Sequence, residues 1–358
     1  MKRRIGILTS GGDCPGLNAA IRGAVKAVYQ RMPEAEIIGI VNGYYGLVNK
    51  EYKLMHPSDF SGIITRGGTI LGTSRVPYKT IQAVGDDQVD KVGQMKQTYG
   101  SLKLDCLLTL GGNGTHKTAN LLSQNGLDVI ALPKTIDNDI FGTEETFGFN
   151  TAVEIGTEVI DRLHTTAASH SRVMVIEIMG NKSGWLTLYA GLAGGADVII
   201  LPEIPYSMDK ICEAIVKRTE NGSVFSIVAV AEGAVSAEEF KMKKKERLSK
   251  RKDAGHLNVG SALAEGIQKN TGIETRATVP GYYLRGGTPT SYDRTLSTRF
   301  GVHAASMIFE GRYGVTVAMA DGKITHNNLS DIAGKPRPVP LSHNVVATAR
   351  SVGIAFGD

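Results

Sequence analysis

The sequence predicts an α/β fold built on mainly parallel sheets. Short runs rich in Val, Ile and Leu alternate along the chain with longer amphipathic stretches, and this alternation is typical of strands covered by helices on both faces of a sheet. The clearest helix is expected at 151–165, where apolar residues recur at three- and four-residue spacing. Strands are expected at nine segments: 5–9, 37–41, 106–110, 128–132, 173–178, 198–201, 224–231, 276–279 and 315–319.

Length and composition bound the class of protein. The 358 residues suffice for two medium domains or one large α/β unit. No apolar run approaches the ~20 residues that cross a bilayer, and the chain reaches Gly11 and Gly12 too early for the apolar core of a signal peptide. We therefore expect a cytoplasmic protein with no membrane partner. The widely separated cysteines, Cys14, Cys106 and Cys212, suggest buried small side chains rather than disulfides or a zinc site.

Positive charge is concentrated in one segment. Residues 241–252 carry eight Lys and Arg residues against one Glu, whereas the whole chain has a net charge of only +5. The remainder is therefore slightly acidic, and no distributed surface that could follow nucleic-acid phosphates is implied. We expect the basic segment to be a solvated loop or helix face, and we expect no nucleic-acid partner.

Polar loops follow several of the predicted strands. Ligands of parallel sheets bind at the carboxyl ends of the strands, so these loops are the candidate site. They are Thr9–Asn18, Gly111–Thr115, Pro133–Asp139, Met179–Asn181, Glu232–Gly233 and Gly281–Gly287.

Two of these loops are rich in glycine. Gly11-Gly12 and Gly111–Thr115 can bring backbone N–H groups close to an anion at the start of the following helix. Steric demands of strand-to-helix turns explain the glycines equally well, and Asn113 and Thr115 could be helix caps. The Gly11-Gly12 loop is neither a Walker A loop nor a Rossmann fingerprint.

The loop Pro133–Asp139 is rich in acid and hydroxyl groups. In an extended segment Thr135, Asp137 and Asp139 would point the same way, and two close carboxylates need a cation or a shared proton. This arrangement suits phosphoryl transfer, in which one carboxylate takes a proton from the attacking hydroxyl and Mg²⁺ neutralises phosphate charge. The alternative is a solvated Asp-Asn-Asp turn. Four arginines could supply phosphate contacts or surface ion pairs: Arg75, Arg172, Arg276 and Arg285.

Six segments together resemble the bacterial 6-phosphofructokinase family, in the family's order and over nearly the whole chain. They are Thr9–Asn18, Arg66–Gly72, Gly111–Thr115, Pro133–Asp139, Met179–Gly180 and Glu274–Thr278. The resemblance implies two three-layer α/β domains with mainly parallel sheets and the active site in the cleft between them. Residues 1–145, completed by part of 283–358, would bind nucleotide, and residues 146–282 would bind the sugar phosphate. It also implies a homodimer or homotetramer with shared active sites.

The same resemblance implies roles for individual residues. The substrates would be ATP and fructose 6-phosphate, with Mg²⁺ as cofactor near Asn113. Asp137 would be the base, with Thr135 and Asp139 as its catalytic neighbours. The donor would be held by Gly12, Arg75, Val76, Gly112, Asn113, Gly114 and Thr115. The sugar would be held by Thr135, Ile136, Asp137, Met179, Gly180, Asn181, Glu232, Tyr282, Tyr283, Leu284 and Arg285, and its 6-phosphate by Arg172 and Arg276 of the adjoining subunit.

The chain departs from the family pattern at informative positions. Asn113 stands where the family usually has a metal-binding aspartate, Asn181 replaces an arginine and Tyr282 a histidine. Gly114 is similar to ATP users, whereas Lys134 is similar to pyrophosphate users, and the combination resembles actinobacterial-type ATP users. We expect ATP as donor. A pyrophosphate-dependent enzyme and a catalytically impaired nucleotide- or sugar-phosphate-binding protein are the alternatives.

Overall fold

A computed structural model describes residues 3–82, 90–253, 255–256 and 258–358. It divides into two units, Met1–Thr151 with Arg285–Arg337 and Ala152–Leu284 with Pro338–Asp358. We call these the first and second unit. The predicted boundaries between the two domains lie after residues 145 and 282. The boundaries between the two observed units lie after Thr151 and Leu284.

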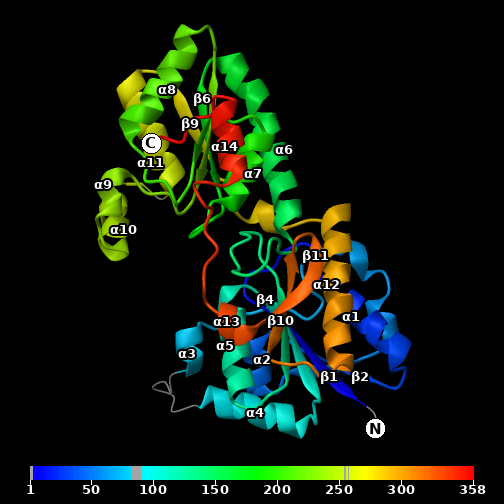
Figure 1. Ribbon diagram of the computed structural model, residues 1–358. Coiled ribbons are helices and arrows are strands. Elements are labelled where there is room, and N and C mark those ends of the chain that lie inside the picture. The colour runs from blue at the N-terminus through cyan, green and yellow to red at the C-terminus, as the bar shows by residue number, and fades with distance from the viewer. Residues whose placement is uncertain (1–2, 83–89, 254, 257) are drawn as a thin grey trace. The chain divides into compact units, whose positions relative to one another are not determined.

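The first unit contains a seven-stranded sheet in the order β11-β10-β5-β4-β1-β2-β3 (Figure 1). Five strands are parallel and were predicted: β1 (Arg4–Ser10), β2 (Glu36–Ile40), β4 (Cys106–Gly111), β5 (Val129–Pro133) and β10 (Val315–Ala320). Two antiparallel edge strands were not predicted: β3 (Tyr52–Met55) and β11 (Lys323–Asn328). These edges are mostly exposed or half-buried, so they lack the apolar runs that mark central strands.

Helices cover both faces of this sheet. Apolar side chains of one face pack into a core with helices α2 (Tyr44–Asn49), α3 (Tyr78–Gln82), α4 (Lys91–Ser101), α5 (Asn113–Gln124) and α13 (Leu329–Ile332). Helices α1 (Leu17–Arg31) and α12 (Ser291–Phe309) pack against each other beside the sheet (Figure 1). Short 3₁₀ turns lie at Pro57–Phe60, Ile63–Thr65 and Gly281–Arg285.

The second unit contains a four-stranded parallel sheet in the order β7-β8-β6-β9. Its strands, all predicted, are β6 (Val173–Ile178), β7 (Val198–Ile200), β8 (Ser226–Ala231) and β9 (Thr275–Thr278). Ile178 pairs with Ala231, so the buried central strands β6 and β8 end side by side. The helices are α6 (Phe149–His170), which contains the predicted helix 151–165, α7 (Trp185–Ala193), α8 (Met208–Glu220), α9 (Ala237–Phe240), α10 (Lys244–Asp253), α11 (Val259–Thr271) and α14 (Asn344–Ser351).

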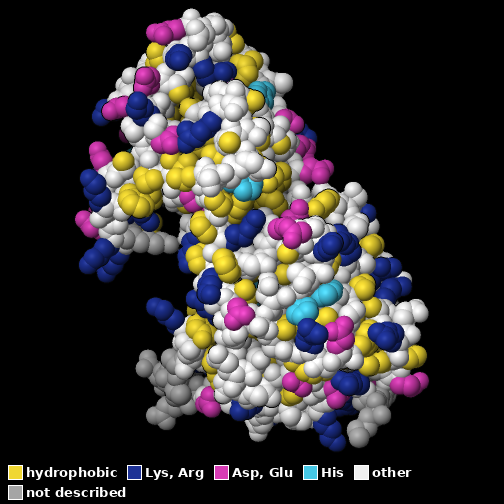
Figure 2. Space-filling model, viewed as in Figure 1, with side chains coloured by type: hydrophobic (Ala, Val, Ile, Leu, Met, Phe, Trp, Pro, Cys, Tyr) yellow, Lys and Arg dark blue, Asp and Glu magenta, His cyan; other side chains and the backbone are white. Residues whose placement is uncertain are grey.

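Three expectations about composition can be compared with the structure. Cys14, Cys106 and Cys212 are free and buried, as predicted. Among the described helices, none is long and apolar enough to cross a membrane. The basic segment forms α10 and its approach, and Figure 2 shows exposed Lys and Arg side chains there. The prediction of a solvated face is wrong for one member, since the side chain of Arg251 is only 13% exposed.

Candidate active site

A pocket of about 370 Å³ lies at the carboxyl ends of β1, β4 and β5 in the first unit. Three of the six loops predicted from the sequence meet there, namely those after β1, β4 and β5. Arg285 joins them from a fourth predicted loop, Gly281–Gly287, and Arg75 joins from another part of the chain. The predicted site residues that line the pocket are Gly12, Arg75, Val76, Gly112, Asn113, Gly114, Thr115, Lys134, Thr135, Asp137, Asp139 and Arg285.

The loop after β1 is held by hydrogen bonds from half-buried and buried polar groups. The backbone N–H of Gly11 donates to the carbonyl of Ser74 at 3.1 Å, and Thr73 Oγ1 donates to the carbonyl of Gly11 at 2.7 Å. Lys134, at the end of β5, donates its ammonium to the carbonyl of Gly12. Its side chain is buried, and burial lowers the pKa of Lys134. Lys134 therefore fixes the glycine loop and places a cation at the pocket wall.

Two arginines converge on Gly12. A Cβ atom at Gly12 would lie 2.8 Å from Arg285 Nη1 and 3.2 Å from Arg75 Nη2, so a side chain there would displace the guanidinium groups. Arg285 Nη1 also donates to the carbonyl of Asp13 at 3.3 Å, while its buried Nε has no hydrogen-bond partner among the described residues. The pair can therefore offer positive charge and N–H donors to a bound phosphate.

Helix α5 begins directly at the pocket, with Gly112 as its N-cap. The N–H groups of the first turn have no intrahelical acceptor and can bind an anion. The suggestion that Asn113 and Thr115 are caps is wrong, because both lie inside the first turn and bond elsewhere. Thr115 Oγ1 donates to the carbonyl of Ser10 at 3.3 Å and so ties the first turn of α5 to the end of β1. A Cβ atom at Gly111 would lie 2.1 Å from Thr115 Oγ1, which explains the glycine there.

The acidic loop turns rather than extends. The backbone bends at residues 136–137, and Asn138 has a left-handed φ of 49°, a conformation that Asn tolerates better than most residues. The predicted extended alternation is therefore wrong, yet Thr135, Asp137 and Asp139 all line the pocket. Thr135 Oγ1 accepts from the N–H of Asp137 at 3.0 Å, and this short turn orients the Asp137 backbone.

Asn113 and Asp139 form a polar pair across the pocket floor. Asn113 Nδ2 donates to the Asp139 carbonyl at 3.0 Å and to its carboxylate Oδ2 at 3.1 Å. The buried Asn113 Oδ1 has no hydrogen-bond partner among the described residues. Oxygen ligands of this kind suit Mg²⁺, which is usually held by one or two carboxylates together with substrate phosphates and water. The side chains present therefore fit the predicted metal.

The predicted sugar residues of the second unit gather at the carboxyl ends of β6 and β8. Met179, Gly180 and Asn181 follow β6, and Glu232 follows β8. The N–H of Glu232 donates to the carbonyl of Ile178 at 2.9 Å, and that of Gly233 donates to the carbonyl of Gly180 at 3.1 Å. The two loops are therefore one hydrogen-bonded structure.

Arg172 and Arg276 lie at the opposite end of this sheet. Arg172 precedes β6, and Arg276 is paired with Met174 near the amino ends of β6 and β9. Both bind Glu274, with nitrogen–oxygen distances of 2.8 Å and 2.6 Å, and hydrogen bonding from Arg172 lowers the pKa of Glu274. The length of β6 therefore separates them from Met179–Asn181 within one chain, by ~20 Å at ~3.3 Å per residue.

Four predicted sugar residues differ in burial. Ile136 and Leu284 are completely buried, so neither residue is open to a ligand in this structure. Tyr282 and Tyr283 are 79% and 80% exposed.

Comparisons with known proteins agree with this geometry. The phosphofructokinase family model matches residues 4–308. The chain belongs to the phosphofructokinase family. A curated relative from Spirochaeta thermophila, an ATP-dependent 6-phosphofructokinase, is 56% identical over 99% of this chain and 98% of its own length.

Solved phosphofructokinases share the fold. The Pichia pastoris phosphofructokinase has a TM-score of 0.79 and 29% identity; the match covers 99% of this chain but only 37% of that longer chain. The pyrophosphate-dependent phosphofructokinase of Nitrosospira multiformis has a TM-score of 0.82 and 18% identity, and the match covers 99% of this chain and 93% of that chain. At this identity the likeness shows the fold alone. The predicted family and α/β fold class are confirmed.

In this phosphofructokinase-family chain, His116 was missed by the sequence analysis. It is completely buried, with Nδ1 3.0 Å from the carbonyl of Gly112 and Nε2 2.9 Å from Thr316 Oγ1. Because a carbonyl can only accept, Nδ1 carries the proton and Nε2 accepts from the threonine. Burial lowers the pKa of His116 to about 4, so the ring is neutral near pH 7. Its position four residues after Gly112 places it one helical turn into α5, but nothing in the sequence indicates the contact with Thr316.

Proposed function

We propose that this chain is an ATP-dependent 6-phosphofructokinase that transfers the γ-phosphoryl group of ATP to the 1-hydroxyl of fructose 6-phosphate. One observation carries the proposal: two carboxylates, Asp137 and Asp139, share a pocket with the cations of Lys134, Arg75 and Arg285. Such a pocket can remove a proton from an alcohol and neutralise the charge of a transferring phosphoryl group. The activity named for the 56% identical relative supports the same conclusion.

Asp137 is the proposed base. Its carboxylate would accept the proton of the 1-hydroxyl as the oxygen attacks phosphorus, and Thr135 would hold the turn that carries it. The ammonium group of Lys134 lies within electrostatic range of Asp137. Asp139 would remain fixed by its hydrogen bond from Asn113.

Mg²⁺ is the proposed cofactor, held by Asn113 Oδ1 and the carboxylate of Asp139 together with the donor phosphates. When bound, it supplies charge neutralisation of the phosphate oxygens. The first turn of α5, Arg75 and Arg285 would hold the remaining phosphate oxygens.

The donor is proposed to be ATP because the pocket is open at Gly114. A Cβ atom at this position would have no neighbour within 4 Å among the described residues, so the fold does not require glycine there. Glycine instead leaves space for a ligand. Pyrophosphate is the alternative donor, favoured by Lys134, which lines the pocket as a buried cation.

The site is proposed to be shared between subunits of a homodimer or homotetramer. The first unit would bind the donor and the second unit the sugar, through Met179, Gly180, Asn181 and Glu232. Arg172 and Arg276 lie at the other end of the same sheet, so they would bind the 6-phosphate in the site of a neighbouring subunit. The expected cytoplasmic location stays a prediction.

A donor-by-acceptor activity matrix tests this function. The purified chain is assayed with ATP or pyrophosphate against fructose 6-phosphate or sedoheptulose 7-phosphate, with and without Mg²⁺. We expect Mg²⁺-dependent turnover of ATP with fructose 6-phosphate, and a ~10²- to 10⁴-fold lower kcat in Asp137→Asn. Asp321→Asn, an exposed aspartate in the same unit, is the control. Turnover with pyrophosphate alone would favour the second donor, and no turnover with any donor would favour a binding protein.

A further inference from the structure

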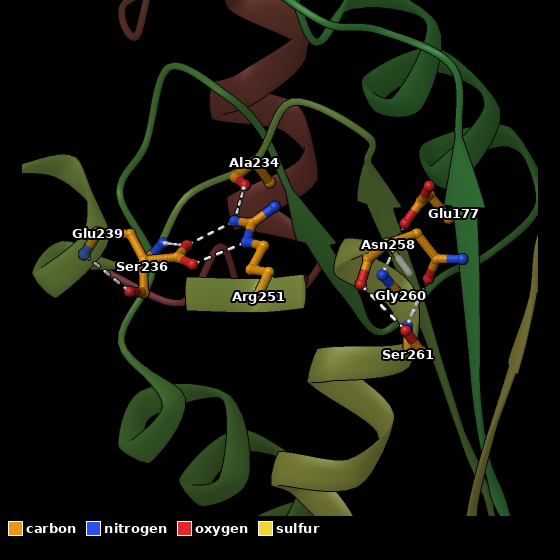
Figure 3. A network of polar contacts seen from close by, with 8 residues as sticks. All are labelled: Glu177, Ala234, Ser236, Glu239, Arg251, Asn258, Gly260 and Ser261. Atoms are coloured by element: carbon orange, nitrogen blue, oxygen red, sulfur yellow. Dashed lines mark hydrogen bonds and ion pairs between the residues drawn. The ribbon is translucent and has the colours of Figure 1, made fainter. Parts of the chain in front are cut away.

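Arg251, a member of the basic segment 241–252, turns into the protein. Its neighbours Lys250 and Lys252 are exposed, whereas the side chain of Arg251 is 13% exposed and lies against α9 and the loop after β8 (Figure 3). A solvent-facing helix needs no buried guanidinium, so this orientation requires a separate explanation.

The guanidinium group bridges two parts of the second unit. Nε donates to Glu239 Oε1 at 2.7 Å, and Nη2 donates to Glu239 Oε2 and, at 3.0 Å, to the carbonyl of Ala234 (Figure 3). Glu239 also closes a capping box with Ser236, in which each backbone N–H donates to the other side chain. Arg251 therefore fixes both the start of α9 and the loop before it.

The carbonyl that Arg251 holds belongs to the turn Glu232–Ala234. The turn is closed by the N–H of Ala234, which donates to the carbonyl of Ala231 at 2.9 Å. A Cβ atom at Gly233 would lie only 2.0 Å from the carbonyl oxygen of Asn181, so this turn and the loop after β6 are in close backbone contact. A shift at Ala234 must move Glu232 against Gly180 and Asn181.

A second buried side chain, that of Glu177, forms a hydrogen bond near the carboxyl end of β6. Glu177, on β6, accepts from the backbone N–H of Gly260 at 2.7 Å and so anchors the first turn of α11 (Figure 3). Its buried carboxylate lies within electrostatic range of both Glu232 and Arg251. The positive charge of Arg251 therefore balances an otherwise acidic cluster around Glu232.

The pairing of Arg251 with Glu239 is strong. Burial alone would raise the pKa of Glu239, but the hydrogen bonds and charge of Arg251 outweigh burial and lower it. Removal of the guanidinium would leave a buried carboxylate and the Ala234 carbonyl without this donor, and unpaired buried groups drive local rearrangement.

We propose that Arg251 is a positioning residue for sugar-phosphate binding, which holds the turn Glu232–Ala234 against Gly180–Asn181 from a helix outside the binding site. This inference rests on the proposed function, in which Glu232 contacts the sugar. It gives the basic helix α10 a role in substrate affinity, through one inward arginine rather than through its exposed lysines. The donor pocket lies in the first unit, so the effect is selective for the sugar.

The test compares Arg251→Gln and Arg251→Lys with Lys252→Gln, an exposed neighbour on the same helix. KM and kcat are measured for both substrates, fructose 6-phosphate binding is measured by calorimetry, and melting temperature is recorded. We expect R251Q to raise the KM and Kd for fructose 6-phosphate about tenfold, the scale of one charge-assisted hydrogen bond, with the KM for ATP within about twofold of wild type. R251K retains the positive charge but lacks the paired N–H donors of the guanidinium group. We therefore expect its KM for fructose 6-phosphate to rise about threefold. K252Q should match wild type.

The outcomes separate the two proposals. A wild-type chain that neither binds nor phosphorylates fructose 6-phosphate overturns the proposed function and this inference with it. An active wild type with unchanged sugar KM and Kd in R251Q overturns the inference alone, even if the melting temperature falls, as does an equal loss of affinity for both substrates. If R251Q does not fold, R251K decides: a sugar KM equal to that of K252Q refutes the positioning role.

Discussion

Asn113 donates its side-chain amide to the carboxylate of Asp139, with Nδ2 and Oδ2 3.1 Å apart. This bond turns the amide oxygen of Asn113 away from Asp139, and the oxygen is buried without a hydrogen-bond partner among the described residues. A neutral amide can therefore sit beside a carboxylate without repulsion while still offering one oxygen ligand. An aspartate in place of Asn113 would offer a stronger ligand but would repel Asp139 until a cation bound.

Asn113→Asp should make stability depend on Mg²⁺. Without the metal we expect the unfolding free energy to fall by about 1–2 kcal/mol, because a hydrogen bond is replaced by like-charge repulsion. Added Mg²⁺ should restore it and raise the melting temperature more than in wild type. Thermal melts across a Mg²⁺ titration measure this, with Asn125→Asp at the exposed end of α5 as control. Equal Mg²⁺ responses in wild type and N113D would argue against metal binding at this position.

Gly114→Asp should weaken ATP binding without unfolding the chain. A side chain there meets no described atom within 4 Å of Cβ, so the carboxylate would project into the pocket and repel the nucleotide phosphates. We expect the KM for ATP to rise ~10-fold or more, or about 1.4 kcal/mol in binding, with little change in melting temperature. Gly100→Asp, an equally open glycine in α4, is the matched control. An unchanged KM for ATP would show that the donor does not approach Gly114.

The central strands and the loops after them could be predicted because both signals are local. The apolar runs of β1, β4 and β5 mark buried parallel strands, and the carboxyl-end rule then brings their loops together. The edge strand β11 could not be found this way, because its half-exposed residues have no apolar run. The turn at Asn138 also replaced the expected extended backbone, although the side chains converged as predicted.

Contacts between distant residues were beyond the sequence. The bond between His116 and Thr316 joins residues 200 positions apart, and neither residue type is unusual in a helix or a strand. Arg251 was hidden in a run of eight basic residues, where composition predicts solvent. Only the three-dimensional packing shows that Arg251 is turned inward against Glu239.

His116 should make stability fall in acid. Burial lowers the pKa of the folded-state His116 to about 4 from the usual histidine value of about 6.5, so the unfolded state binds the proton first as pH falls. The contribution of neutral His116 to the unfolding free energy is complete above about pH 6.5, declines as the pH falls, and is lost by about pH 4. The total loss is about 3 kcal/mol. Urea unfolding of wild type and His116→Gln between pH 4 and 8 measures the difference, with exposed His170→Gln as control. Parallel pH profiles for wild type and H116Q would contradict this account.

Two inactive variants should restore each other if the sites are shared. Arg276 lies at the amino end of its sheet, opposite to Met179–Asn181, so Arg276→Ala should damage the site of a neighbour while Asp137→Asn damages its own. In a mixed dimer, one of the two sites then keeps both native side chains. Equal co-expression with random assembly should therefore recover about a quarter of wild-type activity. Sites contained within one subunit would give no recovery, and a monomer in sedimentation analysis would exclude sharing altogether.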